Sequence, residues 1–128
     1  FEDHDLRILS RSLQSLQTLS LYCCEELSNA CVKYVARMRE LRNLNLALPC
    51  LIDRALLQIS TLTNLEELSL EGCSYITGDG FRVFQHLPNL RALNVRSCES
   101  FLILEHLSAA SLLSSLDLRF SPITHTHT

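Results

Sequence analysis

Five copies of one hydrophobic pattern recur along the chain at nearly constant spacing. In each copy an apolar residue recurs after three and then two positions, and a small residue follows three positions later. The copies begin at Leu16, Leu41, Leu65, Leu90 and Leu113. The small residue that ends the pattern in each copy is Cys24, Pro49, Cys73, Cys98 or Ser121. Because apolar and polar residues alternate in the middle of each copy, every copy predicts a short β-strand with its apolar side chains on one face.

The predicted strands span residues 18–22, 43–47, 67–71, 92–96 and 115–119. The residues expected to point inward are Leu19, Leu21, Leu44, Leu46, Leu68, Leu70, Leu93, Val95, Leu116 and Leu118. About 20 residues separate successive strands, which is long enough for a crossover that returns the chain and pairs the strands in parallel.

Apolar residues spaced three apart on the first three returns predict short helices. The first is expected over 29–38 with Ser28 as N-cap and Val32, Val35 and Met38 buried. The second is expected over 54–61, capped by Asp53, and the third over 80–86, capped by Asp79. Their predicted buried residues are Leu56, Ile59, Leu62, Phe81, Phe84 and Leu87. The fourth return, 101–110, has no obvious cap and predicts a looser or 3-10 outer side.

The pattern and its period, which falls in the range of about 20–29 residues, are typical of leucine-rich repeats. The predicted fold is therefore α/β: a right-handed solenoid with parallel strands on the concave face and short helices or 3-10 turns on the convex face. Residues 1–128 are expected to form one solenoid segment. Leu6, Leu9 and Leu13 fit the outer side of an earlier repeat, and no polar cap is visible at either end. We therefore expect the segment to belong to a longer repeat protein.

Composition narrows the function classes. The chain has 128 residues, 28 of them leucine, with 47% hydrophobic residues, a net charge of −3 and a pI of about 5.9. That balance provides no broad basic field for nucleic acid or anionic lipid. No apolar run is long enough to span a bilayer, and no signal segment is present at the start.

The six cysteines are interpreted as packing residues. Cys24, Cys73 and Cys98 occupy the same slot of the pattern, where the chain turns off the strand, and are expected to be buried with their thiols near backbone groups. The adjacent pair Cys23–Cys24 does not have the spacing of zinc ligands. All six thiols are expected to be free, without metal, which favours a reducing, intracellular compartment (cytoplasm or nucleus) over secretion. Disulfides and a metal site are the weaker alternatives.

The run from Cys73 to Phe81, CSYITGDGF, resembles the cysteine-containing subclass of leucine-rich repeats, whose pattern is Cys-x-x-Ile-Thr-Asp before an apolar residue. Residues 24–28 match this pattern in degenerate form, and residues 51–53 match only its last positions. This chain departs from the pattern by the insertion of Gly78 and by Pro49 in the cysteine slot. The resemblance implies a fold shared with receptor subunits of F-box ubiquitin ligases and with protozoan repeat proteins, and it implies no active-site residue.

Motifs for catalysis are missing from the sequence. It has no phosphate-binding loop, nucleophile elbow or zinc-protease motif. His86 and His106 fall on outer segments, and His125 and His127 alternate in the tail, where a frayed terminus is a simpler explanation than a metal site. We therefore expect no enzyme activity, cofactor or small-molecule substrate.

The solvent-facing strand positions either form a merely solvated face or carry a contact patch for a partner. The central column is Ser20, Asn45, Ser69, Asn94 and Asp117, and the neighbouring columns contain the candidate partner-binding residues. These candidates are Tyr22, Glu67, Glu71, Arg96 and Arg119. Glu71 could pair with Arg96, whereas Arg96 beside Arg119 would favour an acidic partner.

The predicted function is a protein–protein interaction module in a larger assembly. The alternatives are a substrate-receptor arm of an F-box ligase and an accessory nucleic-acid or ligand-binding domain of an enzyme. Direct nucleic-acid contact is disfavoured because the face lacks aromatic platforms and a basic stripe.

Overall fold

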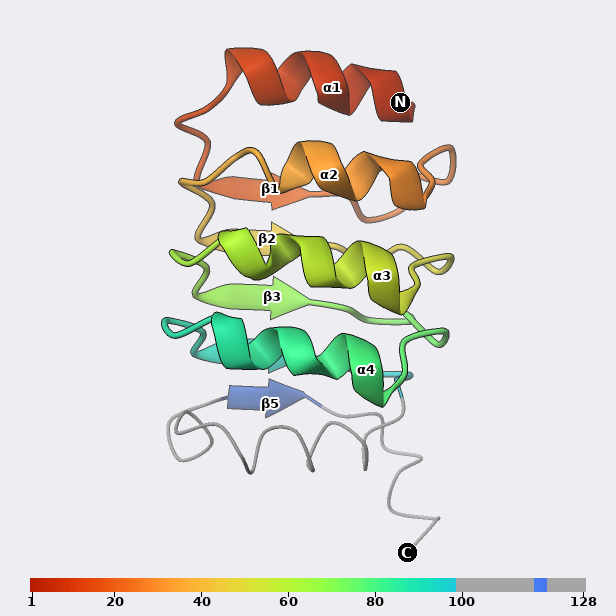
Figure 1. The fold of residues 1–128 in the computed structure, drawn as a ribbon. Helices are drawn as coiled ribbons and strands as arrows, with labels where there is room; N and C mark the ends of the chain where they lie inside the picture. Colours follow the sequence, from red (N-terminus) through yellow and green to blue (C-terminus); the bar gives the residue numbers. More distant parts are fainter. Residues whose placement is uncertain (99–116, 120–128) are drawn as a thin grey trace, which may run out of the picture.

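The computed structural model describes residues 1–98 and the backbone of residues 117–119. The chain is α/β, with a parallel sheet on one side and helical segments stacked on the other, as Figure 1 shows. The strands are β1 (Thr18–Ser20), β2 (Asn43–Asn45), β3 (Glu67–Ser69), β4 (Ala92–Asn94) and β5 (Asp117–Arg119). They lie in the order in which they occur in the sequence, and every adjacent pair is parallel. The predicted α/β class and parallel pairing are confirmed.

The helical side is built from mixed short segments. These are α1 (Asp3–Ser12), η1 (Asn29–Cys31), α2 (Val32–Val35), α3 (Asp53–Leu56), η2 (Leu57–Thr61), α4 (Gly78–Phe81) and η3 (Arg82–His86). Each return after α1 combines one α-helical turn with a 3-10 segment, where single helices were predicted. A 3-10 segment advances farther per residue than an α-helix, so it covers the width of a layer with fewer residues. The predicted return 101–110 and His106, His125 and His127 lie outside the described residues.

The core lies between the sheet and the helical side. The predicted inward strand residues of copies two to four are all buried, from Leu44 to Val95, and Leu19 in the first copy is half-buried. The expected apolar residues of the returns are buried as well, and Phe81 stacks on Phe84 with 5.9 Å between ring centroids. α1 packs beside α2 and buries Leu6, which agrees with the expectation that residues 4–13 form the outer side of a layer. Leu13, however, is 43% exposed.

The fifth strand corrects the predicted register. The spacing of the leucines placed Leu116 opposite Leu93, but the structure pairs Leu93 with Leu118. Ala92 and Asp117 are paired across β4 and β5, as Thr18 and Asn43 are across β1 and β2. The number of residues from Ala92 to Asp117 equals the number from Thr18 to Asn43. The predicted register would have left this return shorter than the others. A shift of two positions is permitted because it keeps the alternation of inward and outward side chains, whereas a shift of one would reverse it.

Two of the three predicted helix caps are also corrected. Ser28 caps η1 as predicted, since its Oγ accepts from the N–H of Ala30 at 3.2 Å. Asp53 is the first residue of α3 rather than its cap, and Thr77 rather than Asp79 caps α4. Asp53 instead uses its carboxylate on the next layer, where it accepts from the N–H of Thr77 at 2.7 Å and from the Thr77 hydroxyl.

This contact between layers recurs along the stack. Asp3 accepts from the N–H of Ser28 at 2.9 Å, and Asn29 accepts from the N–H of Ile52 at 2.9 Å, each at the position that Asp53 occupies in its own return. Side-chain oxygens at the start of one helical return therefore bind the backbone that begins the next return. The contacts fix the register of the helical side, while the parallel ladder fixes that of the sheet.

Candidate binding face

The strands end early because polar side chains in the central column turn back onto the chain. Asn45 and Asn94 accept through Oδ1 from the N–H groups of Ala47 and Arg96, at 3.1 and 3.2 Å. Ser20 and Ser69 make the longer equivalent contacts, each 3.5 Å, to the residues two positions on. Asn and Ser favour such local turns, which compete with continued pairing in the sheet. Each strand is therefore shorter than predicted and ends at its central-column residue in β1 to β4.

The same bonds orient the donors of this column toward the groove. The Oδ1 of Asn45 is engaged with the backbone, and no described group accepts from its Nδ2. The hydroxyls of Ser20 and Ser69 accept from backbone N–H groups, and no described group accepts their protons. Asn94 differs, because its Nδ2 donates to Glu71 Oε1 at 3.0 Å. The floor of the groove thus presents a short row of hydrogen-bond donors.

These donors line an open groove of about 410 Å³ that crosses four strands. Its lining residues are Thr18, Leu19, Ser20, Asn43, Leu44, Asn45, Glu67, Leu68, Ser69, Ala92, Leu93 and Asn94. Towards the strand ends a second hollow, of about 230 Å³, continues the groove between Tyr22 and Glu71, with Ala47 between them. Tyr22 is 62% exposed there, so a large aromatic side chain stands at the rim.

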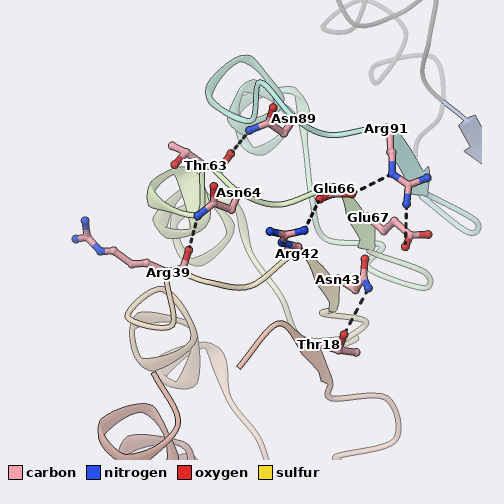
Figure 2. Close-up of polar contacts among 10 residues, drawn as sticks. All are labelled: Thr18, Arg39, Arg42, Asn43, Thr63, Asn64, Glu66, Glu67, Asn89 and Arg91. Carbon is pink, nitrogen blue, oxygen red and sulfur yellow. Dashed lines mark hydrogen bonds and ion pairs between the residues drawn. The ribbon is translucent and has the colours of Figure 1, made fainter. Parts of the chain in front are cut away.

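The opposite edge of the face carries an ion network, drawn in Figure 2. Glu66 lies between two arginines, 3.7 Å from Arg42 Nη1 and 3.2 Å from Arg91 Nε. Arg91 also approaches Glu67 Oε2 at 3.9 Å. The side-chain amide of Asn43 satisfies both of its polar atoms when its nitrogen donates to Glu67 Oε2 at 2.7 Å. Charge at this edge is therefore largely neutralised within the sheet, and such exposed pairs contribute only ~0–1 kcal/mol each to stability.

Beside this edge, two asparagines connect neighbouring layers, and Figure 2 shows both contacts. Asn64 Nδ2 donates to the carbonyl of Arg39 at 3.1 Å, and Asn89 Nδ2 donates to the carbonyl of Thr63 at 2.8 Å. Each asparagine directly precedes the first leucine of its copy. Both amides are thus used for stacking and are not directed at a partner.

The structure brings together only some of the predicted binding residues. Tyr22 and Glu71 share a hollow, and Arg96 follows at the end of the next strand with its side chain exposed. Glu67 lies at the other edge of the face. The predicted pairing of Glu71 with Arg96 is wrong, since Glu71 accepts from Asn94 instead. The backbone stays beside the preceding copy as far as Arg96, whose carbonyl accepts from the N–H of Gly72 at 2.8 Å, but the Glu71 carboxylate is bound by the Asn94 amide.

The predicted neighbourhood of Arg96 and Arg119 is wrong as well. The corrected register of β5 places the backbone of Arg119 opposite Asn94, in the central column, two positions from Arg96. By the same shift Asp117 pairs with Ala92 and leaves the central column. Arg96 and Arg119 are therefore not opposite one another, and their positions no longer indicate an acidic partner on this face. Arg96 and Tyr22 keep their exposed positions at the rim.

The cysteines occupy the layers as free thiols. Cys73 is buried and donates to the carbonyls of Leu46 and Leu48 in the preceding layer, at 3.5 and 3.4 Å. Cys98 likewise donates to the carbonyl of Leu70, at 3.1 Å. Both positions match the prediction.

Cys24 does not match it, because this thiol is only half-buried and reaches the Tyr22 carbonyl of its own copy at 3.9 Å. β1 is the edge strand of the described sheet, so no preceding strand offers Cys24 a carbonyl.

Burial decides the ionisation of these thiols. Desolvation raises the pKa of Cys73 to about 12, and the neighbouring thiol of Cys98 adds to the rise. Burial raises the pKa of Cys31 to about 12, with a further contribution from Asp3, and that of Cys98 to about 11. A thiol needs its thiolate form to act as a nucleophile or a metal ligand, so these three groups are suited to packing at neutral pH.

The side chains that could bind a metal ion do not cluster in the described residues. Within residues 1–98, no three His, Cys, Asp or Glu side chains gather in a way that could hold a metal ion. His86 is exposed at the end of η3. No helix in the described part of the chain is long and apolar enough to cross a membrane.

A comparison with models of known protein families gives no match, and neither does a comparison with curated proteins. Sequence reasoning found the rim residues Tyr22, Glu71 and Arg96 but missed the role of the central column. The signal was present, because Ser or Asn occupies the central position of four consecutive copies, where an Asx or Ser turn can close a strand.

Proposed function

We propose that this chain is part of a leucine-rich repeat solenoid and that its sheet face binds a segment of a partner protein. The observation that carries the proposal is the row of hydrogen-bond donors on the groove floor, at Ser20, Asn45 and Ser69. Their oxygens are engaged with the chain's own backbone, so the donors remain for acceptors on a partner. The carbonyl groups of a loop or an extended segment are acceptors of this kind.

The rim supports the same proposal. Tyr22 borders the second hollow and is largely exposed, and Arg96 is exposed at the same edge. Tyrosine and arginine are enriched among the residues that dominate binding energy at protein interfaces. The groove itself is open and crosses several strands, which suits a polypeptide better than an enclosed small molecule. The proposed role is binding, without catalysis, within a multi-subunit assembly.

The test is quantitative co-purification of partner proteins with the tagged chain and its variants. Asn45→Asp keeps the Oδ1 that holds the Ala47 N–H but replaces the groove-facing donor with an acceptor, so the strand end is preserved while recognition is reversed. Tyr22→Ala removes the rim aromatic. We expect both variants to reduce partner recovery about tenfold, a change equivalent to ~1.4 kcal/mol.

Two matched controls separate the face from general effects. Gln85→Glu makes the same amide-to-acid change on the exposed outer side of η3, and Tyr75→Ala removes a tyrosine that is 66% exposed outside the groove. Both should leave partner recovery unchanged. Equal recovery with Asn45→Asp and wild type, or equal losses with the controls, would contradict the proposal.

A further inference from the structure

Positive charges gather on the outer side of the first two helical layers. Arg7 and Arg11 lie one turn apart on α1, and Lys33 and Arg37 lie one turn apart along α2 and the turn that follows it. All four side chains are exposed. From Ser28 to Arg39 the chain contains no acidic residue. This surface therefore carries four positive charges on a chain whose net charge is −3.

The two pairs lie side by side. α1 and α2 are neighbours in the stack, as Figure 1 shows, and Asp3 on α1 binds Ser28 just before η1. Arg7 follows Asp3 by one turn, and Lys33 follows Ser28 at a similar distance along its own return. Packed helices lie ~8–10 Å apart, which is close to the Debye length of ~8 Å at physiological ionic strength. The four cations therefore repel one another without full screening.

The acidic residues at the start of α1 are already engaged, and Glu40, exposed three residues after Arg37, forms no ion pair with a described residue. Asp3 binds Ser28, and Asp5 accepts from the N–H of Glu2 at 2.7 Å while its other oxygen lies 3.5 Å from His4. These groups all belong to the start of α1. None of the four cations forms an ion pair with a described residue, in contrast to Arg42, Arg82 and Arg91.

Tyr34 lies within this basic surface. The Lys33 ammonium and the Arg37 guanidinium each lie 5.2 Å from its ring centroid, so two cations cover the ring. The cation–π contacts hold the two positive side chains over the half-buried ring instead of letting them extend freely. Holding them in this way lowers the entropy lost when they meet an anionic group. Ile8, 53% exposed on α1, adds an apolar side chain nearby.

We propose that Arg7, Arg11, Lys33 and Arg37 form a second docking surface, on the outer helical side, for a short acidic segment of a partner protein. The segment would place carboxylates about one helical turn apart against the two cation pairs. Arginine binds carboxylates through its planar fork of donors, and Ile8 favours an apolar residue among the acidic ones. This surface lies on the opposite side of the layers from the groove and is independent of it.

The structure favours an acidic polypeptide over a nucleic acid or a membrane. Single-stranded nucleic acid is held by bases that stack on open aromatic faces, but the ring of Tyr34 is already covered by Lys33 and Arg37. A long polyanion would also extend from the four cations onto Glu2, Asp3 and Asp5. The basic surface is therefore short, and it matches a short run of carboxylates.

The test measures binding to the full chain by fluorescence anisotropy with four probes. The first is a labelled peptide with glutamates one helical turn apart and leucines between them, and the second is the same peptide with glutamine in place of glutamate. The third is a short single-stranded RNA, and the fourth is a vesicle containing phosphatidylserine. We expect the acidic peptide to bind, with an affinity that falls as salt rises, and the glutamine peptide not to bind.

Matched variants locate the site. Arg37→Glu and Arg11→Glu should each weaken binding of the acidic peptide about three- to tenfold, the range for reversing one exposed charge pair. Arg96→Glu makes the same change in charge on the sheet face and should leave the affinity within about twofold. Circular dichroism confirms that each variant is folded. Equal weakening by Arg96→Glu, tighter binding to RNA or vesicles than to the acidic peptide, or binding to none of the probes would overturn the proposal.

Discussion

The contact between Asp53 and the next layer permits a sharp test of how the layers are held together. The Asp53 carboxylate accepts from the N–H and the hydroxyl of Thr77. Gly80 lies against the same carboxylate, since a Cβ at Gly80 would meet Asp53 Oδ1 and would also lie 2.9 Å from Ile76 Cγ2. An alanine at this position therefore cannot coexist with the two hydrogen bonds.

The expected energies follow from these contacts. Hydrogen bonds to charged groups are each worth about 1.5–3 kcal/mol, but Thr77 is exposed and water can replace part of this, so Asp53→Ala should lower the free energy of unfolding by about 2 kcal/mol. Gly80→Ala should displace the carboxylate and lose the same bonds. That loss is offset by about 1 kcal/mol because alanine is the better helix former, which leaves a net loss of about 1 kcal/mol.

The double variant distinguishes this mechanism from simple crowding. Once Asp53→Ala has removed the carboxylate, Gly80→Ala retains only the contact with Ile76 and should be neutral or slightly stabilising. Urea denaturation of the four proteins measures the coupling, expected at about 1–2 kcal/mol. If Gly80→Ala costs the same in both backgrounds, within about 0.5 kcal/mol, the carboxylate does not determine the need for glycine and the reasoning fails.

Three further outcomes are expected. Leu68→Ala removes a side chain that is 2% exposed in the middle strand and should cost about 2–5 kcal/mol in urea denaturation; a loss below about 1 kcal/mol would contradict central burial. Folding raises the pKa of Cys31 and Cys73 above the ordinary 9.0, so the unfolded chain ionises first. The contribution of these two thiols to the free energy of unfolding should then be constant below pH 9 and fall above it by up to about 1.4 kcal/mol per pH unit for each thiol. A replacement of both cysteines by alanine should flatten that decline. In thiol alkylation of the native protein near neutral pH, exposed Cys23 should react well before buried Cys73, and equal rates would show that the layers open readily.

The sequence by itself determined the layers. The alternation around Leu44 and Leu68 defined the strands and their inward faces, and the spacing of Leu56 and Ile59 defined the buried side of a return. The burial of Cys73 and Cys98 followed from their shared slot. Such features are local and periodic, so a single chain reveals them without knowledge of its neighbours.

Tertiary structure decided what depends on contacts between layers. Asp53 looked like a cap because its own segment offers N–H groups, but the N–H of Thr77 in the next layer donates to its carboxylate instead. The register of β5 pairs Leu93 with Leu118 and not with Leu116, and this separated Arg119 from Arg96. The four cations of the outer side come from α1 and from the return that follows it, and only the stacking of α1 on α2 brings them together. Stacking juxtaposes residues that are one repeat apart, and a local pattern of apolar residues contains no information about which polar groups meet there.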